Sequence, residues 1–153
     1  NAPALLKLRE EGAAVAVTVD CGVTAYEPLL EAAKAGLDMI VIDHHQAEIA
    51  LPRAVAVVDP NRIDDDSPHK QLAAVGVAFL LAVGVNRALR AAGWYGDQRP
   101  EPDLRQWLDL VALGTVADLV QALARFKTHT RDVVSILKAL KAAGALHAEL
   151  VVQ

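Results

Sequence analysis

The sequence predicts an α/β fold, with a parallel β-sheet flanked by helices and a helical C-terminal part. Three stretches of small and β-branched residues are expected to be the strands: "AAVAVTVD" at 13–20, "DMIVID" at 38–43 and "AVAVVDP" at 54–60. A helical pattern lies between the first two, and the order strand, helix, strand implies a right-handed crossover and parallel pairing. The composition of the first stretch is typical of a strand covered on both faces.

Helices are expected before, between and after these strands. Residues 3–11 are rich in Leu, Lys and Glu and precede a glycine that suits a helix C-cap. Thr24 and Glu27 have capping-box spacing ahead of the next helix, which should end at Gly36. Pro28 must then lie in its first turn. The later helices are expected over residues 73–92, 104–113 and 132–143.

Composition limits the possible functions. The chain has 153 residues, of which 54% are hydrophobic, so it can bury a substantial core. Its formal net charge of -4 argues against a self-sufficient nucleic-acid binder. The single cysteine, Cys21, is expected to be a small buried residue, and one cysteine fits a cytoplasmic protein. The apolar stretch 72–85 is shorter than a membrane span of roughly 20 residues, so no membrane contact is expected.

Each predicted strand is followed or closed by an aspartate: Asp20, Asp43 and Asp59. Ligands bind at the carboxyl ends of parallel strands, and carboxylates with imidazoles but no thiolate cluster favour Mn²⁺ or Mg²⁺ over structural zinc. Such aspartates also commonly cap helices or turns. His44 and His45 are adjacent and are expected to point in different directions, so a metal ligand at His44 would leave His45 for another task, such as contacting a phosphate. A purely structural histidine pair is the alternative.

Four motifs in order resemble the DHH phosphoesterase superfamily, and specifically RecJ-type single-strand-specific exonucleases. They are "TVDCGV" at 18–23, "VIDHH" at 41–45, "LAAVGVAFLLA" at 72–82 and "LDLVALGTVADLV" at 108–120. The resemblance implies that residues 1–120 are a partial DHH phosphoesterase domain. Residues 121–153 are then a helical tail that the resemblance does not assign.

The resemblance also implies a role for each site residue. Asp20 matches an aspartate that bridges two manganese ions, and His44 and Asp118 match further ligands of one of them. His45 matches a histidine that contacts the scissile phosphate, and Asp43 matches a carboxylate that orients the histidine pair. The implied reaction is Mn²⁺- or Mg²⁺-dependent hydrolysis of single-stranded DNA in the 5′-to-3′ direction, in DNA repair and recombination.

The superfamily's first motif, resembling "DYDVDG", has no counterpart in this sequence. By the resemblance, the second ion keeps only Asp20, so the chain is expected to be a fragment of the exonuclease that is inactive alone. The domain that grips single-stranded DNA in this family is also without a counterpart, so DNA would be bound by the complete parent protein.

Two alternative functions remain open, and under each of them self-association of the chain is expected. The chain could be a degenerate DHH scaffold or protein-binding module, or an oligoribonuclease or nucleotide phosphatase of the same superfamily. A sheet without the strand that carries the first motif would expose an unpaired edge, so self-association is expected.

Overall fold

The computed structural model describes residues 1–125 and 130–142. The chain forms two compact units, Asn1–Pro102 and Asp103–Gln153, and each is described by itself. The boundary between these units, after Pro102, differs from the domain boundary expected after residue 120. The extent of the catalytic domain stays a prediction.

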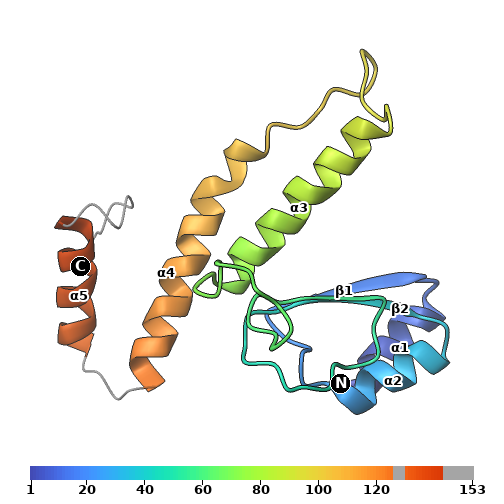
Figure 1. Cartoon of the computed structure of the whole chain (residues 1–153), viewed down its shortest axis with the longest axis horizontal. Helices are drawn as coiled ribbons and strands as arrows, with labels where there is room; N and C mark the ends of the chain where they lie inside the picture. The colour runs from blue at the N-terminus through green and yellow to red at the C-terminus, as the bar shows by residue number, and fades with distance from the viewer. Residues whose placement is uncertain (126–129, 143–153) are drawn as a thin grey trace. The chain divides into compact units, whose positions relative to one another are not determined.

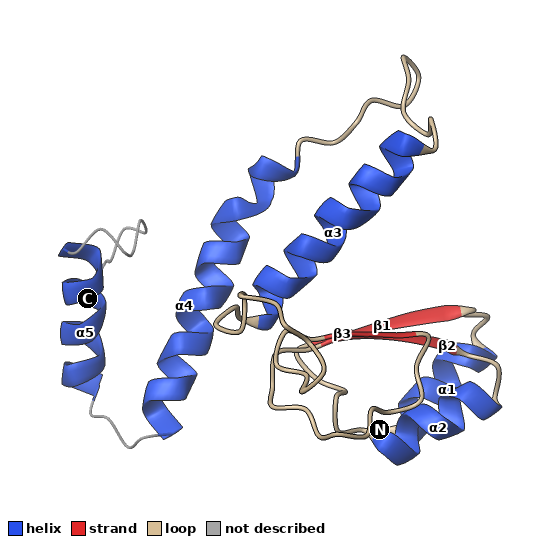
Figure 2. Cartoon of the chain, in the orientation of Figure 1, coloured by secondary structure: helices blue, strands red, loops and turns tan. Residues whose placement is uncertain are grey.

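The first unit contains a three-stranded parallel sheet in the order β1-β2-β3, with β1 at Val15–Val19, β2 at Asp38–Ile42 and β3 at Ala56–Val58. The register aligns the last residues of the three strands, so their carboxyl ends meet at one edge of the sheet (Figure 2). The predicted strands and their parallel pairing are confirmed.

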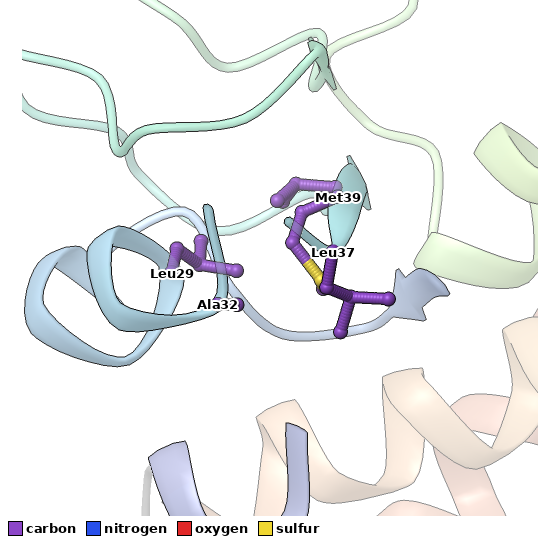
Figure 3. Close-up of a cluster of buried hydrophobic side chains, with 5 residues drawn as sticks. Leu29, Ala32, Leu37 and Met39 are labelled. Atoms are coloured by element: carbon purple, nitrogen blue, oxygen red, sulfur yellow. The ribbon is translucent and has the colours of Figure 1, made fainter. Parts of the chain in front are cut away.

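Helices α1 (Ala2–Glu10) and α2 (Tyr26–Lys34) pack on each other, and both lie below the strands in Figure 1. Apolar side chains of α2 and β2 and of the turn between them form the core in Figure 3: Leu29, Ala32, Leu37, Met39 and Val41. Removing a side chain of the size of Leu or Met from water contributes about 1.5–3 kcal/mol. The core therefore fixes β2 and its carboxyl end.

The start of α2 differs from the expected capping box. Ala25 occupies the N-cap position, and no side chain caps the helix there. Thr24 and Glu27 therefore do not act as the predicted cap, although Pro28 lies in the first turn as expected. Helix α2 is stabilised instead by burial of its apolar face, which includes Leu29 and Ala32.

One face of β1 is less covered than its composition suggests. Val15, Val17 and Val19 are 52%, 49% and 47% exposed. The prediction that β1 is covered on both faces is wrong, because only its alternate residues turn toward the α2 side of the sheet. Helix α3 (Ala74–Ala91) contacts β1 and β2 but leaves these valines half exposed.

The second unit is helical. A 3₁₀ turn, η1 (Leu104–Trp107), leads into α4 (Leu108–Arg125), and α5 (Thr130–Ala142) follows. Helix α4 passes through the predicted end at residue 113, because an isolated Gly114 inside an apolar helix costs only about 1 kcal/mol relative to alanine. In length and hydropathy α3 and residues 104–125 could each cross a membrane, but core helices meet the same criteria, and α3 contacts the sheet.

Candidate metal centre

The turn after β1 presents Asp20. The backbone N–H of Asp20 donates to the carbonyl of Ile42, 3.0 Å away, which ties the turn to the end of β2. Asp20 has φ +66, a left-handed conformation that aspartate tolerates better than most residues. Gly22 has φ +125, and a Cβ there would lie 2.9 Å from Oγ1 of Thr18 and 3.0 Å from Cγ1 of Val41. This turn therefore requires glycine.

The carboxylate of Asp43 is buried at the end of β2 and accepts several hydrogen bonds. Its Oδ2 accepts from the N–H of Val23 at 3.0 Å. Its Oδ1 accepts from the N–H of His44 at 2.9 Å, and from Nδ1 of the His45 ring at 2.7 Å. Burial by itself would raise the pKa of Asp43, but these hydrogen bonds together lower it. Asp43 is therefore ionised, and it ties the turn after β1 to the loop after β2.

The His44 ring is oriented by a backbone carbonyl. Its Nδ1 lies 3.2 Å from the carbonyl oxygen of Leu72, and its Nε2 lies 3.2 Å from Oδ1 of Asp20. The Asp43 side chain contacts the His45 ring and the backbone N–H groups of both histidines. Asp43 was expected to orient both histidine rings. It orients only the His45 ring, and the Leu72 carbonyl orients the ring of His44, the candidate metal ligand.

The two histidine rings lie close together, with centroids 4.7 Å apart and an angle of 61° between the planes. The expectation that they point to different places followed from strand geometry, but β2 ends at Ile42 and the histidines lie in the loop beyond it. Candidate ligand atoms of Asp20, His44 and His45 all lie within 4.8 Å of one another. The loop brings three of the five predicted site residues into one cluster, with Asp43 directly behind it.

The donor set fits a divalent cation. Two ligands of an octahedral ion at ~2.1 Å lie about 3 Å apart, close to the Asp20–His44 distance of 3.2 Å. An Asp–His hydrogen bond has the same length, so the fit rests also on the donor chemistry: one carboxylate and imidazole nitrogens without thiolates, which suits Mn²⁺ or Mg²⁺. A cavity of about 310 Å³ adjoins the cluster. It is lined by Asp20, Cys21, Gly22, Val23, Thr24, Asp43 and His45.

Three features of the site differ from expectation or lack a sequence signal. Cys21 is exposed rather than buried as expected. The Leu72 carbonyl acts through the backbone, which no side-chain pattern marks. Asp59, the third strand-end aspartate of the sequence, is not part of the cluster of Asp20, His44 and His45. It is buried after β3, and its Oδ1 accepts from the N–H of Asn61 at 2.8 Å. Burial raises the pKa of Asp59, and the charge of Asp43 adds to this effect.

Asp118 lies on α4 in the second unit. The cluster of Asp20, His44 and His45 lies in the first unit, so the membership of Asp118 in the metal centre stays a prediction.

The second unit is similar to another family. The model of the flagellar P-ring protein matches residues 101–152. Flagellar P-ring protein 1 of Hahella chejuensis is 62% identical over 39 residues, which cover 26% of this chain and 10% of that protein. The sequence motifs did not indicate this similarity of the tail. The matched residues 101–152 also include Asp118.

The larger part of the chain is similar to exonucleases. The single-stranded-DNA-specific exonuclease RecJ of Dickeya dadantii is 44% identical over 111 residues, and that of Escherichia coli K12 is 44% identical over 110 residues. These matches cover 72% and 71% of this chain and 19% of each relative, so the chain spans about a fifth of their length.

Solved structures agree with the sequence matches. A crystal structure of exonuclease RecJ bound to manganese has a TM-score of 0.57 and 33% identity, covering 74% of this chain and 26% of that one. RecJ from Thermus thermophilus in complex with Mn²⁺ has a TM-score of 0.55 and 32% identity, covering 74% and 15%. The model of the DHH family, N-terminal domain, matches residues 3–115. With the parallel sheet and the clustered Asp20, His44 and His45, these matches show that the chain belongs to the DHH family.

Proposed function

We propose that this chain carries one metal-binding half of a RecJ-type phosphodiesterase site that acts on single-stranded DNA. The observation that carries the proposal is the pairing of Asp20 with His44, whose ligand atoms lie 3.2 Å apart at the carboxyl ends of two adjacent strands. Relatives named as single-stranded-DNA-specific exonucleases support the substrate class.

Each residue of the cluster has a distinct task in this proposal. Asp20 and His44 would hold the divalent cation, and Asp118 is the proposed third ligand. When bound, the cation would activate water and neutralise charge on the phosphoryl oxygens. His45 donates Nδ1–H to Asp43 at 2.7 Å, and a proton on Nε2 as well would let that nitrogen donate to an oxygen of the scissile phosphate. Asp43 fixes the orientation of that ring.

The complete reaction requires more than the described cluster supplies. In 5′-to-3′ hydrolysis for DNA repair and recombination, a second ion would need ligands besides Asp20. Within the described residues, the metal-ligand cluster contains Asp20, His44 and His45 and no further carboxylate. We therefore propose that the chain binds about one equivalent of Mn²⁺ and does not hydrolyse DNA alone. We also propose that the protein is cytoplasmic, which is consistent with its similarity to exonucleases named for their action on DNA.

Mn²⁺ binding tests the proposal directly. Electron spin resonance would count the ions bound to the wild type, to Asp20→Asn and to His44→Gln, with Cys21→Ser as a matched variant in the same turn. We expect about one equivalent for the wild type and Cys21→Ser, and loss of binding in the other two. Equal binding by all four proteins would remove the basis for the proposal.

Self-association is part of the proposal. The apolar face of β1 is half exposed, and β1 pairs only with β2 within the described residues. An uncovered apolar face beside an unpaired strand edge favours contact with a second copy of the chain.

A further inference from the structure

We propose that Asn61 is a positioning residue for His44. It would do so by joining the loop after β2 to the loop after β3. The inference deepens the proposed function, because His44 is a metal ligand only if that proposal holds. The contacts themselves lie entirely within the first unit and involve described residues.

The side-chain amide of Asn61 reaches two backbone carbonyls. Its Nδ2 donates to the carbonyl of His44 at 2.6 Å and to that of Lys70 at 3.1 Å. An asparagine amide nitrogen carries two hydrogens, so both carbonyls can be satisfied at once. Asn61 is therefore bound on one side to the candidate ligand and on the other to the segment that approaches α3.

The position of Asn61 is itself fixed. Buried Asp59, directly after β3, accepts from the backbone N–H of Asn61 at 2.8 Å. The ammonium group of Lys70 donates to the carbonyl of Pro60 at 3.1 Å and to that of Asp65 at 3.2 Å. These bonds close the loop between β3 and α3 on itself, so the amide is held from both ends of this loop.

The consequence for His44 follows from the next contact along the chain. Two residues after Lys70, the carbonyl of Leu72 faces Nδ1 of His44 at 3.2 Å. Asn61 thus fixes the separation between the His44 backbone and the backbone that orients its ring. With Nδ1 engaged, Nε2 is the nitrogen that faces Asp20. Groups that orient a metal-binding histidine typically change metal affinity by about 10- to 100-fold when mutated.

A loop tie that only stabilises the fold would behave differently from a positioning residue. It would lower thermal stability without a selective effect on His44. The His45 ring provides an internal comparison, because it is held by Asp43 and has no contact with Asn61 among the bonds that orient it.

The experiment compares Asn61→Ala and Asn61→Asp with Gln46→Ala. Asn61→Asp keeps the shape but replaces the donor by an acceptor that faces two carbonyls. Gln46 donates to the carbonyl of Asn61 at 3.4 Å and so bridges the same loops through a different bond from those that Asn61 makes to His44 and Lys70. Two readouts are taken on protein whose folding is checked by circular dichroism: the Mn²⁺ Kd, and the ring ¹⁵N chemical shifts of His44 and His45 in metal-free protein.

We expect the Mn²⁺ Kd to rise about 10- to 100-fold in Asn61→Ala and further in Asn61→Asp, and to change less than about twofold in Gln46→Ala. The His44 ring shifts should move while those of His45 stay in place. Unchanged His44 shifts in folded Asn61 variants would overturn the positioning role, even if the wild type binds Mn²⁺. If the wild type binds no Mn²⁺ but the Asn61 variants shift the His44 ring signals selectively, the proposed function is contradicted and the positioning role is kept.

Discussion

Nδ1 of His45 lies 2.7 Å from Oδ1 of Asp43, so an accessible imidazole is held by a carboxylate that is 1% exposed. The same carboxylate accepts the N–H of Val23 from the turn after β1. One buried charge therefore couples a candidate catalytic ring to the turn that presents Asp20.

Asp43→Asn should be destabilising. The amide keeps one acceptor, but it cannot accept from both the part-buried His45 ring and the buried N–H of Val23, so at least one of these donors loses its partner. The expected loss is about 1–3 kcal/mol in free energy of unfolding, measured by urea denaturation. Asp38→Asn is the control, since Asp38 is exposed on the same strand, and its effect should be within about 0.5 kcal/mol. A loss no larger than the control would contradict the coupling role.

Asp43 and Asp59 should affect the pH dependence of stability with opposite signs. The pKa of Asp43 is lowered below 3.8 in the folded state, so its stabilisation is present above that value and is lost as pH falls through the lower folded pKa. The pKa of Asp59 is raised above 3.8 by burial, so its contribution falls as pH rises from 3.8 through the raised pKa.

Asp59→Asn isolates the second effect. The asparagine can still accept from the N–H of Asn61 but cannot ionise. Relative to the wild type, it should become more stable between pH 3.8 and pH 7, by about 1.4 kcal/mol for each unit by which the folded pKa exceeds 3.8. Thermal unfolding across this range measures the difference. A difference independent of pH would contradict the raised pKa.

Gly22→Ala should disrupt the turn before α2. The added Cβ would meet Thr18 and Val41 at 3.0 Å or less, and φ +125 is unfavourable for alanine. The expected loss is about 1–3 kcal/mol or more, with weaker Mn²⁺ binding because Asp20 lies in this turn. The same substitution at Gly84 is the control: it lies in α3 with no atom near the added Cβ, so it should stabilise by about 0.5–1 kcal/mol.

Asp118→Ala tests which similarity describes α4. Asp118 lies beyond residues 3–115, which match the DHH family, and within residues 101–152, which match the flagellar P-ring protein. If it is the third ligand, the Mn²⁺ Kd should rise by about an order of magnitude or more, whereas exposed Asp109→Ala on the same helix should have no effect. Unchanged affinity would separate α4 from the metal centre.

Val17→Lys tests self-association through the half-exposed face of β1. Sedimentation velocity over a range of concentrations should show association of the wild type and its loss in the variant, since a charge on that face opposes contact. Leu8→Lys on α1, where Leu8 is 41% exposed, controls for the added charge and should associate as the wild type does. A wild type that is monomeric at high concentration would contradict the proposal.

The sequence by itself determined the order of elements, because each depends on local pattern. Branched residues marked the three strands, and the helix between the first two required a parallel crossover. Since parallel strands end at the same edge, Asp20, Asp43 and Asp59 could be assigned to one edge from the sequence alone. The four motifs pointed to the DHH family on local residues alone.

Only the tertiary structure decided which groups touch. The Leu72 carbonyl orients His44 and the Asn61 amide joins two loops, and these contacts span 28 and 17 residues of sequence. Exposure of Val17 and of Cys21 also depended on tertiary packing, because a strand's composition does not say whether a layer covers each of its faces. Local pattern sets secondary structure, whereas ring orientation and burial depend on loops whose meeting is fixed by packing of the whole unit.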